Sequence, residues 1–471
     1  MLPWWLFAIL FLLAAWALLD HLLMPGVRWV LRRRINRVIE EVNTRLNISI
    51  RAFQLTKRQV LIDRLIYDPK VIEALQAYAT EHKMPRAVAQ AEVLRYAREI
   101  VPAFNAYIYF RIGYWLAERF ARLLYRVRVG FADNERLATI DPEATVVFVM
   151  NHRSNMDYVL AAFLAAEQTA LSYAVGEWAR LWPLQQLVRA MGAFFVRRNS
   201  KNPLYRRVLE RYVHMATQEG VCQAVFPEGG LSRDGKIQPP RLGILDYMLR
   251  GFDPQANRDI VFVPVGINYD RTLEDRSLVR RLDPDAARRS RWFVLRTTFG
   301  FIVHNIRLML SNRWQRLGYA CVNFGTPISA RAYCAEQQVN FSRLPAAIRF
   351  TEIEKLGRHL MSKVERLVPV LPVALVAAAL LEAPAGQNAF DIKARVYQNM
   401  ERLQQRGAVV IVPWRTRAFS VDTALAMLVR RHLVVEREGR YAPEQKGLTL
   451  LSYYANSIGG GENNSEASVG T

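Results

Sequence analysis

The sequence contains little cysteine and little histidine, which limits the chemistry that it can support. Its three cysteines, Cys222, Cys321 and Cys334, are odd in number and far apart among 471 residues. This pattern argues against a disulfide framework and indicates reduced thiols. No two cysteines have the spacing of zinc ligands, and the seven histidines are scattered. We therefore expect neither a metal site nor a bound cofactor.

Acidic residues are also scarce. The chain has 64 lysines and arginines against 42 aspartates and glutamates, a net charge of +22. Such an excess favours a polyanionic partner, either nucleic acid or a membrane rich in anionic lipid. Because 471 residues exceed one ordinary core, we expect two or three domains, and a hydrophobic fraction of 51% allows a large interior.

One long stretch without charge lies at the N-terminus. Residues Leu2–Leu19 are about long enough to cross a hydrocarbon core, and tryptophans lie near both ends. No basic segment precedes the stretch and no small-residue cleavage site follows it, so an anchor is favoured over a signal peptide. A buried hydrophobic helix is the alternative. The arginines that follow, between Arg28 and Arg37, predict a cytoplasmic body that contacts anionic lipid.

We assign residues 1–24 to this anchor and residues 25–126 to a helical, basic region. The segment EALQAYATEHKMPRAVAQAEVLRYAREI contains good helix formers that are interrupted at Pro85. An aromatic patch follows, which belongs either to the core or to a surface that faces a membrane. The patch consists of Tyr107, Tyr109, Tyr114 and Trp115.

From Val127 onward, short apolar runs alternate with helical patterns. A helix is predicted at Tyr158–Glu167, and strands are predicted at Val127–Phe131, Thr145–Met150, Val221–Phe226, Ile260–Val265 and Tyr319–Phe324. This alternation predicts an α/β domain over residues 127–330, with a mostly parallel sheet flanked by helices.

The stretch TVVFVMNHRSNMDY carries the first candidate site. His152 follows a predicted strand, and Asp157 comes five residues later. On a straight helix the two side chains would lie roughly 140° apart. They can meet if His152 lies in a turn and Asp157 lies in the next helix, which Ser154 or Asn155 could cap. A histidine beside a carboxylate can take a proton from a hydroxyl; a strand–turn–helix junction with a satisfied polar cluster is the alternative.

Two further predicted strands end on unusual polar sequences, PEGGLSRDGK from Pro227 and GINYDR from Gly266. The carboxyl ends of parallel strands line the ligand crevice of an open α/β sheet. In the first motif, Gly229 and Gly230 allow close backbone approach to an anion, and Arg233 and Lys236 supply positive charge. A surface turn with mixed charges is the alternative.

Upstream, GAFFVRR places Arg197 and Arg198 where either could clamp a phosphate, although a solvated basic turn would have the same sequence.

Residues 331–458 are predicted to be mainly helical. The apolar stretch Leu367–Leu381 contains two prolines and is short for a membrane span, so we expect a buried or interfacial helix. The hairpin-like segment LVRRHLVVEREGRYAP is typical of winged-helix DNA-binding units, but the predicted anchor upstream argues against nucleic acid as a partner. Residues 459–471 are predicted to be disordered.

Four motifs in this order resemble the glycerophosphate acyltransferase superfamily, and within it the glycerol-3-phosphate acyltransferases. NHRSNMD resembles the family's signature of a histidine and an aspartate separated by four residues. GAFFVRR, FPEGGLSRDGK and VPVGINYDR resemble its second, third and fourth blocks. The C-terminal stretch GLTLLSYYANSI is similar to the end of the larger glycerol-3-phosphate acyltransferases.

The resemblance implies roles for these residues. His152 would be the general base on the acceptor hydroxyl, and Asp157 would orient it. The implied substrate-binding residues are Arg197, Arg198, Glu228, Gly229, Gly230, Ser232, Arg233 and Lys236. Leu231 stands where the third block usually has an arginine, so Lys236 or an arginine of the second block would have to compensate.

The resemblance further implies transfer of a fatty acyl group from acyl-CoA or acyl carrier protein to the sn-1 hydroxyl of glycerol 3-phosphate, which gives lysophosphatidate. No serine or cysteine lies in a nucleophile-elbow sequence, so direct attack by the acceptor hydroxyl is the simplest route. Lysophosphatidate or dihydroxyacetone phosphate as acceptor, and an inactive scaffold that binds anionic lipid, are the alternatives. We expect a membrane protein with a cytoplasmic catalytic domain, on the inner membrane if the source is bacterial.

Overall fold

The computed structural model describes residues 51–165, 170–176, 184–197, 200–255, 258–280, 282, 316–412 and 417–458. Four predictions lie outside these residues: the anchor at 1–24, the lipid contact of the arginines at 28–37, the role of Arg198 and the tail at 459–471. Among the helices of the described residues, none combines the length and the apolar character needed to cross a bilayer.

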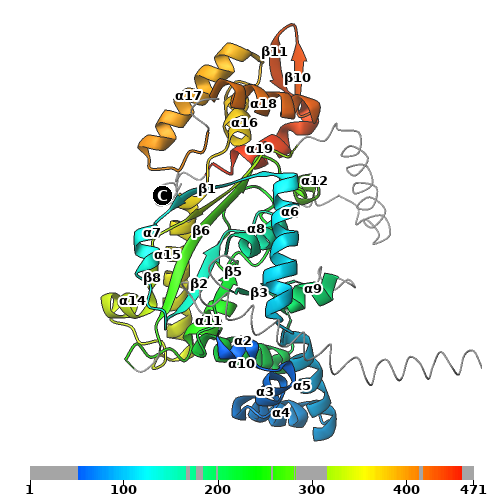
Figure 1. Cartoon of the computed structure of the whole chain (residues 1–471), viewed down its shortest axis with the longest axis vertical. Coiled ribbons are helices and arrows are strands. Elements are labelled where there is room, and N and C mark those ends of the chain that lie inside the picture. Colours follow the sequence, from blue (N-terminus) through cyan, green and yellow to red (C-terminus); the bar gives the residue numbers. More distant parts are fainter. Residues whose placement is uncertain are drawn as a thin grey trace, which may run out of the picture.

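A central sheet positions everything else (Figure 1). Its order is β1-β7-β6-β2-β5-β3-β4, and the short β8 pairs with β6. The strands are β1 (Arg126–Ala132), β2 (Thr145–Met150), β3 (Ser172–Val175), β4 (Ala193–Phe195), β5 (Gln223–Val225), β6 (Ile260–Tyr269), β7 (Tyr319–Phe324) and β8 (Ile328–Ser329).

The prediction of a mostly parallel sheet is confirmed. β2 lies between β5 and β6 and runs parallel to both, β3 is parallel to β4 and β5, and β1 is parallel to β7. Only β7 and β8, among the described strands, pair with β6 in antiparallel fashion. The carboxyl ends of β2, β5 and β6 therefore lie at the same edge of the sheet.

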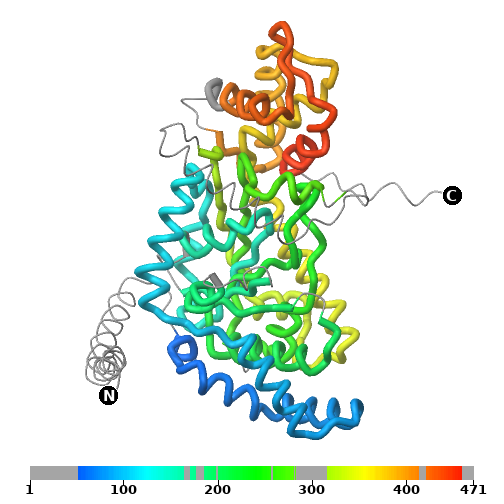
Figure 2. The backbone as a smooth tube through the Cα atoms, turned by 90° about the vertical axis from the view of Figure 1, so that its right-hand side faces the viewer, coloured from blue at the N-terminus to red at the C-terminus, as the bar shows by residue number. Residues whose placement is uncertain are grey.

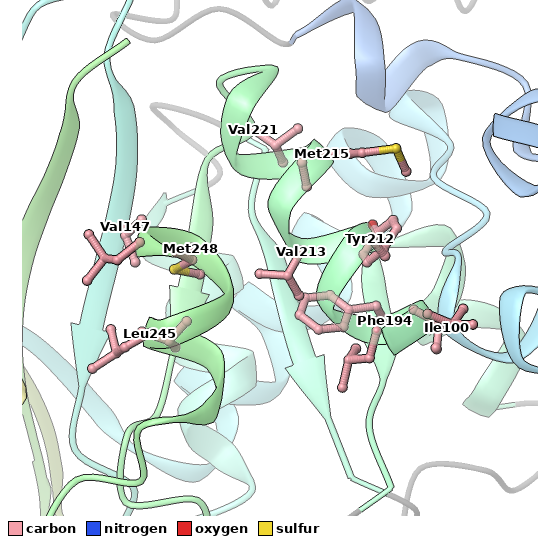
Figure 3. Packing of buried hydrophobic residues seen from close by; sticks show 14 of the residues in the cluster. Ile100, Val147, Phe194, Tyr212, Val213, Met215, Val221, Leu245 and Met248 are labelled. Atoms are coloured by element: carbon pink, nitrogen blue, oxygen red, sulfur yellow. The ribbon is translucent and has the colours of Figure 1, made fainter. Parts of the chain in front are cut away.

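Both faces of the sheet are covered because β2 is apolar on both. Val147 and Val149 point into one core, while Val146, Phe148 and Met150 point into another, as the two-residue period of a strand requires. Figure 3 shows part of the first core, where α10 and α11 pack on the sheet. The helices around the sheet are α6 (Tyr114–Leu124), α7 (Asn134–Ala138), α8 (Met156–Ala165), α9 (Leu184–Ala190), α10 (Pro203–Gln218), α11 (Gly243–Leu249), α12 (Asp275–Arg280), α14 (Ala330–Gln337) and α15 (Ala346–Leu367).

The N-terminal helices form a separate layer beside α10, blue in Figures 1 and 2. They are α2 (Ala52–Leu55), α3 (Arg58–Ile66), α4 (Pro69–Glu81) and α5 (Arg86–Ile100). The predicted interruption at Pro85 is confirmed, because Pro85 immediately precedes α5.

The predicted aromatic patch divides between two environments. A π-helix, η1 (Ile108–Gly113), leads into α6. Tyr109 is 1% exposed and lies in the core, whereas Trp115 is 54% exposed. Tyr109 therefore belongs to the core, whereas Trp115 lies at the surface, and the contact of that surface with a membrane stays a prediction.

The C-terminal domain sits at one end of the sheet, orange and red in Figure 1. The apolar stretch at Leu367–Leu381 forms most of the buried helix α16, which confirms the expectation of a buried helix. The hairpin prediction is also confirmed by β10 and β11. The elements are α16 (Pro372–Glu382), β9 (Gln387–Asn388), α17 (Ala389–Gln405), α18 (Arg417–Arg430), β10 (Val434–Arg437), β11 (Arg440–Pro443), η4 (Gln445–Gly447) and α19 (Leu448–Ala455).

Some predicted boundaries are wrong. β6 continues to Tyr269, four residues beyond the predicted end at Val265, because its distal half gains antiparallel pairing with β7. The strands at Ser172–Val175 and Ala193–Phe195 were not predicted. They are only four and three residues long, and their burial comes from tertiary packing.

Candidate active site

The turn between β2 and α8 brings His152 and Asp157 into contact. Asp157 lies in the first turn of α8, and its Oδ2 is 2.9 Å from His152 Nδ1. The same oxygen accepts hydrogen bonds from the backbone N–H groups of Arg153 at 2.7 Å and Ser154 at 3.0 Å. The tight turn thus directs one ring nitrogen and two backbone N–H groups at a single carboxylate oxygen. The five-residue spacing between His152 and Asp157 fits this turn.

Tyr269, at the end of β6, holds the other carboxylate oxygen. Its hydroxyl donates to Asp157 Oδ1 at 2.6 Å. Burial, reinforced by the charge of Asp157, holds the pKa of Tyr269 well above its usual range, so the hydroxyl remains a donor. Sequence reasoning missed this residue, although the motif GINYDR contains it.

These contacts define the histidine's reactive side. A carboxylate at Nδ1 favours the tautomer with the proton on that nitrogen, which leaves Nε2 as an acceptor. His152 Nε2 is buried and has no hydrogen-bond partner among the described residues. The ring packs between Phe226 and Tyr158, with centroids 4.3 and 5.3 Å away, so its orientation is fixed.

His152 lines a cleft of about 600 Å³. The cleft opens at the carboxyl ends of β3, β4 and β5, where Gly176, Arg197 and Phe226 line it. α10 and α11 supply its other walls. An open α/β sheet binds ligands at this edge.

Glu228 ties the two loops of the site together. Its carboxylate accepts a hydrogen bond from the His152 N–H at 2.7 Å and another from the Gln238 N–H at 3.0 Å. Burial raises the pKa of Glu228 to about 7, although both N–H groups and the charge of Arg153 act in the opposite direction. Glu228 is therefore placed to position the backbone of the histidine.

The two glycines of the third block behave differently. Gly229 lines the cleft and has a φ of +66°, and a Cβ there would lie 2.5 Å from Arg241 Cδ. That position requires glycine on both counts. Gly230 is half-buried beside it but is not among the residues that line the cleft.

The remaining residues of the third block do not reach the cleft. The Ser232 hydroxyl is buried within its own turn, where it donates to the Lys236 carbonyl at 2.8 Å and accepts from the Gly235 N–H at 3.1 Å. Arg233 and Lys236 are exposed, and neither lines the cleft. The role of these two side chains in binding the phosphate of the acceptor stays a prediction.

Arg197 does line the cleft, and contacts with side chains outside the third block hold it in place. Its Nε and Nη2 donate to Glu99 at 2.8 and 2.6 Å, and its guanidinium stacks on Tyr96 and Tyr205. These hydrogen bonds to Glu99 raise the pKa of Arg197 above its usual value. The arginine is thus fixed in place, and its partner Glu99 could not be identified from the sequence because it lies almost one hundred residues away.

Two family models match the chain over these same elements. Residues 128–268 match the Acyltransferase model, and residues 305–459 match the model described as the glycerol-3-phosphate acyltransferase C-terminal region. The chain belongs to the glycerol-3-phosphate acyltransferase family.

Curated members of the glycerol-3-phosphate acyltransferase family extend the match. The glycerol-3-phosphate acyltransferase of Pseudomonas entomophila is 31% identical over 74% of this chain and 42% of its own length. That of Pseudomonas putida KT2440 is 30% identical over 86% of this chain and 49% of its own length. The chain thus spans about half the length of the curated relatives it matches.

A solved structure, the 1-acyl-sn-glycerophosphate (LPA) acyltransferase of Thermotoga maritima, also shows similarity. It is 17% identical and covers 54% of this chain and 78% of its own, with a TM-score of 0.31. A score of this size does not establish a common fold.

In this member of the glycerol-3-phosphate acyltransferase family, the C-terminal region supports the third-block loop. Leu231 packs against the core of the C-terminal domain, which explains an apolar residue at the unusual position. Asn456 Nδ2 donates to the Asp234 carbonyl at 2.9 Å. A Cβ on Gly235 would lie 2.0 Å from the Tyr453 carbonyl oxygen. The segment that follows η4 is thus part of the frame of the site.

Glu274, which lies between β6 and α12, stabilises the turn of the first block. It accepts hydrogen bonds from the Ser154 hydroxyl at 2.7 Å and the Asn155 side chain at 2.9 Å. Within the described residues, no group of three His, Cys, Asp or Glu side chains is placed to hold a metal ion.

Proposed function

We propose that this protein transfers a fatty acyl group from a thioester donor to the sn-1 hydroxyl of glycerol 3-phosphate and so forms lysophosphatidate. One observation carries the proposal: His152 lines a cleft, Asp157 holds its Nδ1, and its Nε2 has no hydrogen-bond partner among the described residues. Family membership supports the choice of substrates, since the curated relatives are called glycerol-3-phosphate acyltransferases.

The mechanism follows from this geometry. Nε2 takes the proton of the acceptor hydroxyl as the oxygen attacks the thioester carbonyl, and Asp157 stabilises the imidazolium that forms. The tetrahedral intermediate then collapses, its C–S bond breaks, and the imidazolium returns the proton to the departing thiolate. Every atom is accounted for without a further reactant, so we propose that the reaction needs no cofactor.

The phosphate of the acceptor would bind at the arginines of the second block. Arg197 lines the cleft and is preorganised by Glu99 and two tyrosines, which limits the side-chain entropy lost on binding. We propose Arg197 and its neighbour Arg198 for this role. Arg233 and Lys236 are left out because neither is among the residues that line the cleft.

An apolar groove beside the cleft suits a fatty acyl chain. It has a volume of about 350 Å³ and is lined almost entirely by apolar side chains of α6, α8 and α9. Tyr158 and Val175 line both the groove and the cleft, so a chain in the groove could have its carbonyl near His152. Such a lining favours an aliphatic chain over a polar ligand.

We further propose that α6 lies against a membrane surface. Four of its large apolar residues are exposed between 40% and 54%: Trp115, Leu116, Phe120 and Leu123. Arg119 and Arg122 are exposed nearby, a combination that fits an anionic bilayer. A cytoplasmic face of the inner membrane would supply that surface, and lysophosphatidate would dissolve in it.

A product assay tests the proposal. The purified protein is supplied with glycerol 3-phosphate, dihydroxyacetone phosphate or lysophosphatidate, each with labelled acyl-CoA or labelled acyl carrier protein. We expect lysophosphatidate from glycerol 3-phosphate as the main product. Preference for either other acceptor would overturn the choice of substrate, and no transfer with any pair would favour a lipid-binding scaffold.

A further inference from the structure

A row of arginines in the cleft has no role in the reaction described above. Arg206 and Arg207 come from α10, and Arg250 directly follows α11. All three line the cleft, yet none belongs to the four family motifs.

The cleft extends along two helices, α10 and α11. Its lining residues in α11 and directly after that helix are Gly243, Ile244, Leu245, Asp246, Tyr247 and Arg250. At 1.5 Å per residue, Arg250 lies roughly 10 Å along the axis from Gly243, which is next to the third-block loop. The cleft therefore extends over the length of α11.

Two buried carboxylates hold Arg207 and Arg250 in place. Glu210 is 4% exposed and accepts from Arg207 Nη1 at 2.8 Å and from Arg250 Nη1 at 2.5 Å. Asp246 is 1% exposed and pairs with Arg250 and with Arg349, whose Nε lies 3.0 Å away. Three guanidinium groups thus share two carboxylates, and the cluster keeps an excess of positive charge.

The cluster presents unused donors and flat apolar surfaces to the cleft. Arg250 Nε is buried without a hydrogen-bond partner among the described residues. Tyr247 stacks with the Arg250 guanidinium at 5.7 Å, and Phe350 is 40% exposed at the same part of the cleft. Fixed cations beside aromatic rings suit a ligand that carries both phosphates and an aromatic base.

We propose that this arginine cluster binds the phosphates of the nucleotide end of a coenzyme A thioester, the acyl donor. This inference rests on the proposed function. In glycerol 3-phosphate only the three-carbon backbone separates the attacking hydroxyl from the phosphate, so its phosphate must lie close to His152. In coenzyme A the long pantetheine arm separates the thioester from the nucleotide, and the extended cleft matches that separation.

Donor kinetics of two substitutions test the proposal. Arg206→Gln and Arg207→Gln leave the Arg250 pairs with Glu210 and Asp246 intact, so the fold should survive. We expect each to raise KM for a medium-chain acyl-CoA about tenfold, the effect of one lost charge-assisted hydrogen bond. KM for the same acyl group on pantetheine, which lacks the phosphates, should not change, nor should KM for glycerol 3-phosphate. Arg358→Gln, an exposed arginine of α15 outside the cleft, is the matched control.

Three outcomes would overturn the proposal. A rise in KM for glycerol 3-phosphate with both donors would assign the arginines to the acceptor. Equal losses with acyl-CoA and acyl-pantetheine would show no contact with the phosphates. Efficient use of acyl carrier protein alone would assign the cluster to an acidic protein surface.

Direct binding separates this inference from the proposed function. Titration calorimetry with free coenzyme A needs no turnover, and we expect the double variant Arg206→Gln/Arg207→Gln to bind it at least tenfold more weakly than the wild type. Binding without acyl transfer would defeat the proposed reaction alone. Transfer from acyl-CoA that is insensitive to both substitutions would defeat only the arginine assignment.

Discussion

Asp157 shows how a single side chain can organise a site. It receives four hydrogen bonds, from one imidazole, two backbone N–H groups and the Tyr269 hydroxyl. Two of the four donors come from residues adjacent to each other in the turn, so they depend only on the local sequence. The tyrosine comes from another strand, and only the sheet brings it close.

Replacement of the histidine is the simplest test at this scale. We expect His152→Ala to leave the unfolding midpoint near that of the wild type and to lower acyl transfer by roughly 10²–10⁴-fold, the usual contribution of a positioned base. His359→Ala, an exposed histidine on α15, is the control and should retain full activity. Near-normal turnover of purified His152→Ala would remove His152 as the base.

Glu228 predicts an unusual pH dependence of stability. Its folded pKa of about 7 lies above the ordinary value of 4.5, so the folded protein binds the proton more tightly than the unfolded chain does. Stability from this group is therefore present below pH 4.5 and lost as the pH rises through 7, by roughly 3 kcal/mol at about 1.36 kcal/mol per pKa unit. Glu228→Gln cannot titrate.

Thermal unfolding between pH 4.5 and 8 measures this difference. Glu228→Gln should be less stable than the wild type at low pH, since its amide meets one of the two N–H donors. The gap should narrow as the pH rises, because only the wild type loses the contribution of Glu228. Parallel curves for the two proteins would contradict the raised pKa.

At the scale of elements, the C-terminal segment fixes the third-block loop through backbone contact. Gly235 has a φ of +86° and lies against the Tyr453 carbonyl. We expect Gly235→Ala to displace the loop and to lower both the unfolding midpoint and kcat. Gly439→Ala is a matched control, because that glycine has a φ of +74° but no heavy atom within 4 Å of the added Cβ.

Comparison of the two glycine variants separates the backbone strain of a positive φ from the displacement of the third-block loop. Each pays about 1–2 kcal/mol for the left-handed backbone conformation, so only the excess in Gly235→Ala reports the contact with Tyr453. Equal losses of stability and unchanged kcat in both would show that the C-terminal segment does not position the loop.

The exposed face of α6 allows a direct test of membrane contact. All three native cysteines are buried, so a spin label on Phe120→Cys should be selective. On anionic vesicles we expect this label to become accessible to oxygen and protected from a water-soluble relaxation agent. A label on Arg358→Cys should stay accessible to water. Unchanged accessibility at position 120 would place α6 away from the bilayer.

At the scale of the whole molecule, a buried ionic cluster joins α12 to the C-terminal domain. Arg431 Nη2 donates to Asp275 Oδ2 at 2.5 Å, and Tyr454 donates to the same carboxylate. Both members of the ion pair have side chains less than 10% exposed. Removal of one partner from such a pair typically costs 3–5 kcal/mol. The two domains should therefore unfold together.

Arg431→Met tests this coupling. We expect the free energy of unfolding to fall by about 3–5 kcal/mol, which lowers the unfolding midpoint. We also expect calorimetric unfolding to separate into two transitions. Arg437→Met, an exposed arginine on β10, should leave a single transition at the wild-type midpoint. A single unshifted transition in Arg431→Met would show that the ion pair does not couple the domains.

The sequence alone determined the parts of this protein that depend on short-range order. The strand at Thr145–Met150 is apolar at every position but its first, and its bounds were predicted to the residue. The contact between His152 and Asp157 needs only one turn, so their spacing allowed it and the family resemblance implied it. The alternation of strands and helices likewise predicted a mostly parallel sheet, because parallel strands need a crossover connection between them.

Tertiary structure alone decided which charges face the cleft. Arg233 and Lys236 carry the same charge as Arg207 and Arg250, but only the latter two line it. Arg250 is held by Glu210, a buried partner distant in sequence, whereas the turn that carries Arg233 and Lys236 is held by the C-terminal domain. A sequence records which residues can ionise, whereas packing fixes the direction of each side chain.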